Sequence, residues 1–403
     1  MTTPFSPQAD DVLLRRLSTI DHLVLVLSGK GGVGKSSVSV QLALSLLASD
    51  PTLNIGLLDV DLTGPSLPRM LGLEGREVLS SQDGWVPVYL DARLNPTSSD
   101  RGARGDGEAT TTTPSGPSEA STSTRDNVDA STTRPPRGKL ACMSIGFLLK
   151  NSRESVVWRG PKKNAMIKQF LGQVRWGHLD YLIVDTPPGT SDEHISLLET
   201  LRPLLVERPD PSPPLPTLSS LLVSTPQALA LLDVSKELSF VRRTKLPLLG
   251  LIENMSGYCC PHCGEVVGVF GQGGGEDFCR REEERKDSDK EGEGGGCRFL
   301  GRIPIDRDLV ALLDDVAEHR NVKLLSDHDE AEPSGDGRIA RRGVASGDGG
   351  TDGRKTLVER YREISSFKVV QELAKEIKVL IAQQAEEERR NREAARAANG
   401  RDE

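Results

Sequence analysis

The stretch of residues 29–36, GKGGVGKS, limits what this chain can fold into more than any other feature. An apolar run at residues 22–27 precedes it and an amphipathic run at residues 37–47 follows it, which predicts a strand, a glycine-rich loop and a helix. In loops of this kind, backbone N–H groups at the start of a helix cradle phosphates, a lysine neutralises them and a hydroxyl binds Mg²⁺. The stretch therefore predicts a phosphate-binding loop, and its flanking elements count against a chance glycine-rich turn.

The residues of this loop have different expected roles. Gly31 and Gly32 allow positive φ and a close approach to the anion, which a Cβ would obstruct. Lys35 is expected to neutralise the phosphates and Ser36 to bind Mg²⁺. Lys30 is a second lysine, which is unusual in such a loop. The residues expected here to bind the nucleotide are Gly29, Lys30, Gly31, Gly32, Val33, Gly34, Lys35, Ser36 and Ser37.

Strands and helices are predicted to alternate along much of the chain. Near-continuous apolar runs of strand length indicate buried strands, and they occur at 54–60, 179–184, 218–224 and 246–252, while 139–149 is core-like sequence. Helical patterns separate some of them, at 165–174 and 226–241. This alternation predicts an α/β fold with a doubly wound, mostly parallel sheet. A leucine pattern in residues 1–17 predicts a lead-in helix, and Asp83-Gly84 between short apolar runs predicts a hairpin.

Composition divides the chain into a core and polar segments. Residues 92–137 contain almost no large apolar side chain, so burial cannot offset the entropy lost on ordering them, and we expect a disordered insertion. Core-like sequence resumes after it, which indicates that the insertion interrupts one domain. The expected units are a single P-loop ATPase domain at 1–91 and 138–325 with a charged loop at 280–296, a polar linker at 326–355, and a C-terminal helix with a charged tail at 356–403.

Charge and composition exclude several classes of partner. The net charge of −8 and an aromatic content of 4% provide neither a basic footprint nor stacking platforms for nucleic acid. The N-terminus lacks a signal sequence and no apolar run approaches the roughly 20 residues that cross a bilayer, so we expect a soluble cytoplasmic protein without a membrane contact. Six cysteines without secretory context favour thiols or metal ligands over a disulfide framework.

Acidic residues follow two of the predicted strands. Asp185 stands at the carboxyl end of its strand, where open α/β sheets place ligands, and it fits the residue that holds Mg²⁺ through water. Asp61 is placed to orient the water that attacks a γ-phosphate, and Asp59 is the weaker candidate of the adjacent pair. The alternative is that these carboxylates only cap helices.

A pair of cysteines, Cys260 and Cys263, forms the second candidate site. A two-residue gap lets both thiolates reach one metal centre, as in iron–sulfur clusters and structural zinc sites. Four ligands are normally required, so a two-fold dimer that supplies the pair twice is the most economical solution. Two alternatives stay open: an intrachain zinc-ribbon-like site with Cys279 and Cys297, and a redox disulfide within the pair. Cys259 is expected to point elsewhere, and Cys142, together with His22, His178 and His194, is expected to be structural.

The motifs together resemble the Mrp-type nucleotide-binding proteins, in the nitrogenase iron protein and MinD group of SIMIBI-type P-loop ATPases with a deviant Walker A loop. The segments that carry this resemblance are GKGGVGKS at 29–36, DVDLTGPS at 59–66, DTPPGT at 185–190, ENMSG at 253–257 and CPHC at 260–263. The family includes the cytosolic iron–sulfur cluster assembly scaffolds of eukaryotes, of which the larger subunit carries an N-terminal four-cysteine motif. No cysteine precedes Cys142 here, so the chain resembles the smaller subunit.

The resemblance implies an ATP-dependent scaffold for cytosolic and nuclear iron–sulfur cluster assembly. It implies a slow ATPase that uses Mg²⁺ and is coupled to the transfer of a labile 4Fe-4S cluster to apo iron–sulfur proteins. The implied partners are the larger scaffold subunit in a heterotetramer, a second copy in a homodimer, client apoproteins and targeting factors.

The resemblance also implies roles for individual residues. Cys260 and Cys263 would bridge the cluster between subunits, and Asn254 would contact the adenine base. Lys30 would reach across the dimer to the partner's nucleotide. The expected catalytic residues are Lys30, Lys35, Asp61 and Asp185.

The sequence departs from the family pattern in three places: Cys259 replaces a usually apolar residue, the insertion at 92–137 is unusual, and Cys279 and Cys297 are additional thiols. These departures bear on the full ligand set and not on the family. Two competing functions are considered as well. One is a zinc-stapled nucleotide switch. The other is a MinD-like membrane-positioning ATPase whose C-terminal helix anchors it to lipid, against which the charged sequence after residue 383 counts.

Overall fold

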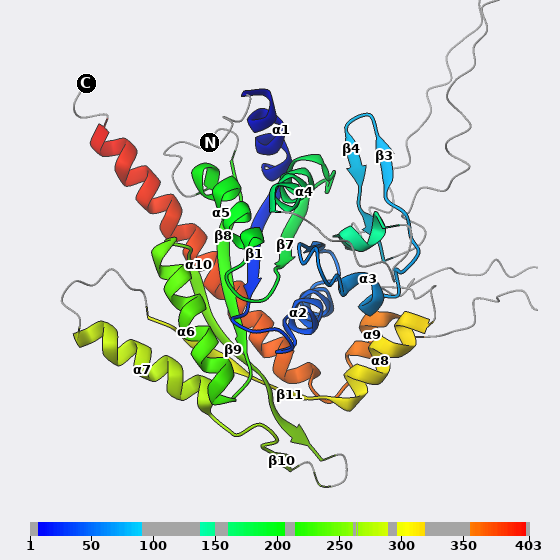
Figure 1. Ribbon diagram of the computed structural model, residues 1–403, viewed down its shortest axis with the longest axis vertical. Coiled ribbons are helices and arrows are strands. Elements are labelled where there is room, and N and C mark those ends of the chain that lie inside the picture. Colours follow the sequence, from blue (N-terminus) through cyan, green and yellow to red (C-terminus); the bar gives the residue numbers. More distant parts are fainter. Residues whose placement is uncertain are drawn as a thin grey trace, which may run out of the picture.

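A central sheet covered by helices on both faces forms the core of the computed structural model (Figure 1). The structure describes residues 7–90, 138–149, 160–205, 214–260, 263, 265–288, 296–318 and 355–399. The predicted insertion at 92–137 and nearly all of the predicted linker lie outside these residues, so both stay predictions. Within the described residues, no helix combines the length and the apolar character needed to span a bilayer.

The sheet has nine strands within the described residues, and most of them are parallel. Its order is β10-β9-β8-β1-β7-β2-β6-β5. The remaining strand, β11, pairs with the edge of β9 that faces away from β8. The parallel strands are β1 (Ile20–Leu27), β2 (Asn54–Asp59), β6 (Lys139–Ser144), β7 (Leu179–Asp185), β8 (Thr217–Ser224), β9 (Leu248–Cys259) and β11 (Phe299–Ile305). The short strands β5 (Val88–Tyr89) and β10 (Val266–Val267) run antiparallel to their neighbours. The doubly wound, mostly parallel sheet is therefore confirmed.

Two apolar layers hold the helices against the sheet. One layer packs the helices α2 (Lys35–Ser49), α3 (Leu67–Met70), α8 (Arg307–Glu318), α9 (Leu357–Tyr361) and α10 (Phe367–Asn399). The opposite layer packs α1 (Pro7–Leu17), α4 (Gly160–Gln173), α5 (Asp192–Leu205), α6 (Ala228–Arg243) and α7 (Gly274–Ser288). Side chains of β1 alternate between the two layers, as strand geometry requires. The predicted lead-in helix is α1, and β3 (Leu79–Ser81) and β4 (Gly84–Val86) form the predicted hairpin.

The C-terminal helices belong to the core of the domain. The Tyr361 hydroxyl lies 2.9 Å from Ser45 Oγ and donates to the Gln41 carbonyl oxygen at 3.2 Å, so α9 is bonded to the helix that follows the phosphate loop. Farther along, Gln384 of α10 accepts a hydrogen bond from Ser219 of β8. The apolar face of α10 is buried against the sheet, and the segment beyond Gln384 continues as a charged helix (Figure 1).

One expectation about the later chain was wrong, and one was confirmed with a different end point. The charge run at 280–296 is not a loop in its first half, because α7 continues to Ser288 and buries Glu282, which accepts from Arg242 and Arg285. The strand predicted at 246–252 is longer than expected and reaches Cys259, since β10 and β11 extend its pairing. One strand therefore connects the core of the sheet with the start of the cysteine motif.

Candidate functional site

The phosphate loop joins β1 to α2, and residues from outside the loop pack closely against two of its glycines. Gly32 and Gly34 adopt left-handed φ values of 80° and 81°. A Cβ on Gly29 would lie 2.3 Å from the backbone of Asp233 in α6, and a Cβ on Gly34 would lie 2.2 Å from Asn254 Nδ2. No side chain caps the first turn of α2 and no acidic residue lies in it. The open N–H groups and positive end of this helix therefore suit a phosphate group.

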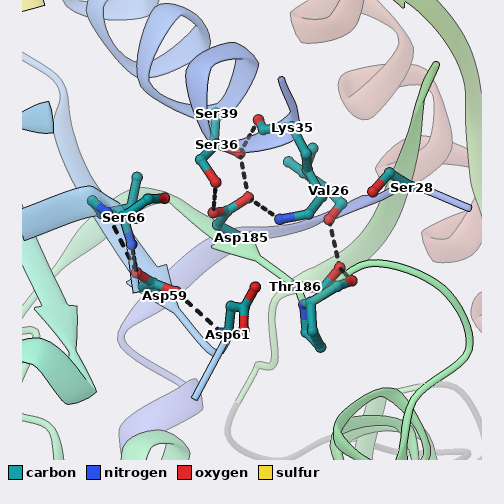
Figure 2. Close-up of polar contacts among 12 residues, drawn as sticks. Val26, Ser28, Lys35, Ser36, Ser39, Asp59, Asp61, Ser66, Asp185 and Thr186 are labelled. Atoms are coloured by element: carbon teal, nitrogen blue, oxygen red, sulfur yellow. Dashed lines mark hydrogen bonds and ion pairs between the residues drawn. The ribbon is translucent and has the colours of Figure 1, made fainter. Parts of the chain in front are cut away.

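Asp185, the last residue of β7, links the carboxyl end of that strand to the phosphate loop (Figure 2). Its Oδ1 lies 2.5 Å from Lys35 Nζ, and its Oδ2 accepts from Ser36 Oγ at 2.5 Å. Ser39 Oγ donates to the same carboxylate at 3.3 Å. Both Lys35 and Asp185 are buried. The structure thus brings together the predicted lysine, the predicted Mg²⁺ hydroxyl and the predicted acidic residue.

Asp59 organises the loop that carries Asp61. Its carboxylate is fully buried and accepts from the Asp61 and Ser66 N–H groups and from the Ser144 hydroxyl, at 3.1 to 3.2 Å. Burial, followed by the neighbouring Asp185 carboxylate, raises the pKa of Asp59 above its ordinary value. From the sequence alone, Asp59 is the weaker catalytic candidate of the pair Asp59 and Asp61. Its position in the structure gives it a supporting role for the Asp61 loop, which the motif alone did not show.

Asp61 itself lies at the surface of the site. It is half-buried, and its Oδ1 accepts from Thr63 N–H, Thr63 Oγ1 and Gly64 N–H. This local turn fixes the position of the Asp61 carboxylate. The helix-capping alternative does not describe Asp61, whose partners Thr63 and Gly64 lie in a turn before α3 begins. It applies in part to Asp59, which accepts from the Leu67 N–H at the start of α3 at 3.4 Å.

Lys30 differs from Lys35 in its surroundings. Its side chain is half-buried and forms no ion pair with any residue that the structure describes. Two exposed leucines of α6, Leu229 and Leu232, are 61% and 64% accessible and precede Asp233, whose backbone packs on Gly29. The helix that packs on the first glycine of the loop therefore carries exposed apolar side chains close in sequence to this contact.

Asn254 of β9 contacts the phosphate loop directly. Its side chain is 6% exposed, and its Nδ2 donates to the carbonyl oxygen of Val33 at 2.9 Å. The following residue, Met255, has a positive φ of 56°, which is uncommon for a side chain of this type. The predicted adenine contact stays a prediction, whereas the contact with the loop is a direct observation.

The cysteine pair lies at the far end of β9, next to β10, which Figure 1 shows at the lower edge of the molecule. The Cys260 N–H donates to the Glu265 carbonyl oxygen at 2.9 Å and closes the turn toward β10. Cys263 is exposed and Cys260 is half-buried. Within the residues that the structure describes, no three His, Cys, Asp or Glu side chains gather at one metal site.

Cys279 and Cys297 are located elsewhere, in the buried layer between α7 and β11. Their Sγ atoms are 3.4 Å apart and both residues are buried, whereas Cys263 is exposed. The hydrogen bond with Cys297 and burial raise the pKa of the Cys279 thiol. The four thiols therefore do not form one intrachain site, and that alternative was wrong for this structure. Cys142 is a core residue, as expected.

His194 is a site-supporting residue whose partner sequence reasoning did not find. In the first turn of α5, its Nε2 lies 2.9 Å from Thr186 Oγ1, and that hydroxyl donates to the Val26 carbonyl oxygen at 2.7 Å. Because the hydroxyl proton is used there, Thr186 accepts from His194 Nε2–H. Burial, followed by Lys35, lowers the pKa of His194 to about 4. A histidine just after DTPPGT is the signal that could have suggested this contact.

Similarity to known proteins agrees with this geometry. A family model described as ParA, NUBPL iron-transfer P-loop NTPase, matches residues 19–110 and 109–333. The cytosolic Fe-S cluster assembly factor CFD1 of Mycosarcoma maydis is 45% identical over 397 residues, which cover 92% of this chain and 91% of that protein. The factor of the same name from Emericella nidulans is 48% identical over 301 residues, 74% of this chain and 82% of that protein.

A solved structure shows a similar fold with a nucleotide. The nucleotide-binding protein of Archaeoglobus fulgidus in complex with ADP is 30% identical, with a TM-score of 0.50. The match covers 77% of this chain and 92% of that protein.

Proposed function

The chain belongs to the ParA family of P-loop NTPases, in the branch described as NUBPL iron-transfer NTPases, and on this basis we propose that it is an ATP-dependent scaffold for cytosolic iron–sulfur cluster assembly. The names of its relatives, which are cytosolic Fe-S cluster assembly factors, support iron–sulfur cluster assembly as the process and the cytosol as the compartment. The observation that carries the proposal is the course of β9, which contacts the phosphate loop through Asn254 and ends at the cysteine pair.

The nucleotide site fits MgATP. The uncapped start of α2 and the left-handed glycines would receive the phosphates, and Lys35 would neutralise them. Ser36 would bind Mg²⁺, which neutralises charge that develops on the phosphates, and Asp185 would hold the ion through water. Asp61 would orient the attacking water. These roles define a slow ATPase whose rate depends on Lys30, Lys35, Asp61 and Asp185.

Dimerisation would complete both sites. Lys30 would act on the nucleotide of the partner, because this half-buried residue forms no ion pair among the described residues. The exposed Leu229 and Leu232 beside the loop would be covered by the same contact. The partner would be the larger scaffold subunit with its four-cysteine motif, in a heterotetramer, or a second copy of this chain.

The iron–sulfur cluster is what the proposed scaffold would bind and transfer. Cys260 and Cys263 supply two thiolates per chain, so two chains together supply the four that a 4Fe-4S cluster requires. The exposure of Cys263 suits transfer to a client apoprotein. A lipid-anchoring role is less well supported, because the apolar face of α10 is already packed on the sheet.

Coupling of the two sites can be tested by cluster transfer. Protein loaded anaerobically, together with its larger partner, is mixed with an apoprotein that accepts a 4Fe-4S cluster, with and without MgATP. We expect ATP to accelerate transfer by the wild type and not by Lys35→Ala, with Lys378→Ala on the exposed side of α10 as a matched control. Equal transfer with and without ATP in the wild type would contradict the coupling.

A further inference from the structure

The peptide group between Val33 and Gly34 is held from outside the phosphate loop. The Val33 carbonyl oxygen accepts from Asn254 Nδ2 at 2.9 Å, and Asn254 belongs to β9 rather than to the loop. In a planar trans peptide, the C=O of one residue and the N–H of the next point in opposite directions. The bond to Asn254 therefore fixes the Gly34 N–H on the side of the loop that faces away from β9. Within the described residues this N–H donates to no other group.

Asn254 is itself held firmly in place. It pairs with Ile303 of β11, and its neighbour Glu253 is fully buried, accepts from the Gly275 N–H at 2.6 Å and lies 3.4 Å from Arg302 Nε. On its other side, Met255 places its Cε 3.3 Å from the position that a Cβ on Gly34 would take. The amide is thus part of a rigid strand, which is the kind of support that positions a binding group accurately.

Close packing explains why the contact reaches the backbone. A Cβ at residue 34 would lie 2.2 Å from Asn254 Nδ2, so the loop approaches this amide at a distance that only glycine allows. The φ of 81° at Gly34 has the same requirement. The loop conformation and the position of Asn254 are therefore mutually dependent.

We propose that Asn254 is a positioning residue of the phosphate loop, which orients the Gly34 N–H toward the triphosphate of the nucleotide. The inference rests on the proposed nucleotide site and adds a role different from contact with adenine. A base contact acts on the nucleoside part of the ligand. A loop-positioning contact acts on the phosphates, because preorganised N–H groups bind an anion without the cost of reorienting the backbone.

Inorganic triphosphate separates the two roles, since it has the phosphates but no base. The affinities of MgATP and of Mg·triphosphate are measured by calorimetry for the wild type, Asn254→Ala and the isosteric Asn254→Asp. We expect Asn254→Ala to weaken both ligands by about tenfold, the loss typical of one buried hydrogen bond. Asn254→Asp should weaken both further, because a carboxylate cannot donate to the Val33 carbonyl and repels the phosphates.

Other outcomes distinguish failure of the inference about Asn254 from failure of the proposed nucleotide site. Weaker binding of ATP with unchanged triphosphate affinity would overturn the inference and leave the nucleotide site intact, since the residue would then act on the base. Unchanged affinity for both ligands would overturn it as well. If neither ligand binds the wild type, or if Lys35→Ala binds both normally, the proposed nucleotide site fails with it. Thermal unfolding without ligand verifies that each variant is folded.

Discussion

Lys35, the first residue of α2, forms a buried ion pair with Asp185, the last residue of β7, with 2.5 Å between Nζ and Oδ1. The same carboxylate accepts the hydroxyl of Ser36. One acidic side chain therefore sets the positions of the lysine and of the Mg²⁺ hydroxyl at once. This relationship links the end of one strand to the start of the helix on which a nucleotide would rest.

Asp185→Asn should reduce ATP turnover by about a hundredfold, the loss typical of removing one electrostatic group at a reacting centre. The amide keeps the size of the side chain but loses the charge that would hold Mg²⁺ through water. Steady-state hydrolysis measured at saturating Mg²⁺ checks this expectation. Glu199→Gln on the exposed side of α5 serves as the control, and a normal rate in Asp185→Asn would remove Asp185 from the mechanism.

Mixing two inactive variants tests whether Lys30 acts across a subunit interface. Lys30→Ala and Lys35→Ala should each hydrolyse ATP poorly as pure proteins. In a mixed dimer, the subunit that lacks Lys30 keeps its own Lys35 and receives Lys30 from the partner, so one site is complete. We therefore expect mixing to restore part of the turnover. Mixtures that stay as inactive as their components, although dimers form, would place Lys30 at its own nucleotide.

Amide substitutions at His194 test its hydrogen bond to Thr186. A glutamine Nε2 can reach the place of the imidazole Nε2–H, whereas asparagine is too short. His194→Asn should destabilise the protein by about 1–3 kcal/mol, because the buried Thr186 hydroxyl loses a donor. His194→Gln should recover part of that loss in chemical denaturation. Equal destabilisation by both variants would mean that packing against Phe240, and not the hydrogen bond, is what His194 contributes.

Glu237 of α6 predicts a pH dependence of stability. It is 1% exposed, neither carboxylate oxygen has a hydrogen-bond partner among the described residues, and burial raises its pKa from 4.5 to about 7. The folded state therefore holds a proton that the unfolded state releases between these pH values. Stability from this group is complete below pH 4.5 and falls as the pH rises through about 7, by about 3 kcal/mol in all.

Glu237→Gln removes this dependence. The variant should unfold at a higher temperature than the wild type at pH 8, and at a similar temperature at pH 4.5, because the neutral amide resembles the protonated acid. Calorimetric scans at both pH values measure the difference, with Glu199→Gln as an exposed control. A variant that is less stable than the wild type at pH 8 would show that the carboxylate has a favourable partner.

The phosphate loop, its flanking elements and the parallel sheet could be predicted because each depends on local sequence. Glycines at 32 and 34 are needed for their backbone conformation, and β1 and α2 bury apolar residues at the expected spacing. Asp185 and Asp59 could be placed at strand ends for the same reason. They lie side by side because β2 and β7 pair in parallel, and the parallel pairing of β1 with β7 brings Asp185 to Lys35, at the start of the helix that follows β1.

Features that depend on tertiary contacts could not be predicted. The charged sequence of α7 resembles a loop, yet Arg242 from α6 allows Glu282 to be buried. The extension of β9 depends on pairing with β10 and β11, which carry weak strand signals. The contacts of Asn254 with the phosphate loop and of Cys279 with Cys297 join residues that no local pattern relates.

Iron and acid-labile sulfide in protein reconstituted without oxygen test the central claim most directly. The wild type, alone and with its larger partner, should bind both in the ratio of a 4Fe-4S cluster. Cys260→Ala and Cys263→Ala should lose them while still binding MgATP, and Cys279→Ser and Cys297→Ser should retain them, because those thiols are buried elsewhere. Wild-type iron and sulfide in Cys260→Ala and Cys263→Ala, or stoichiometric zinc without sulfide in the wild type, would contradict the account.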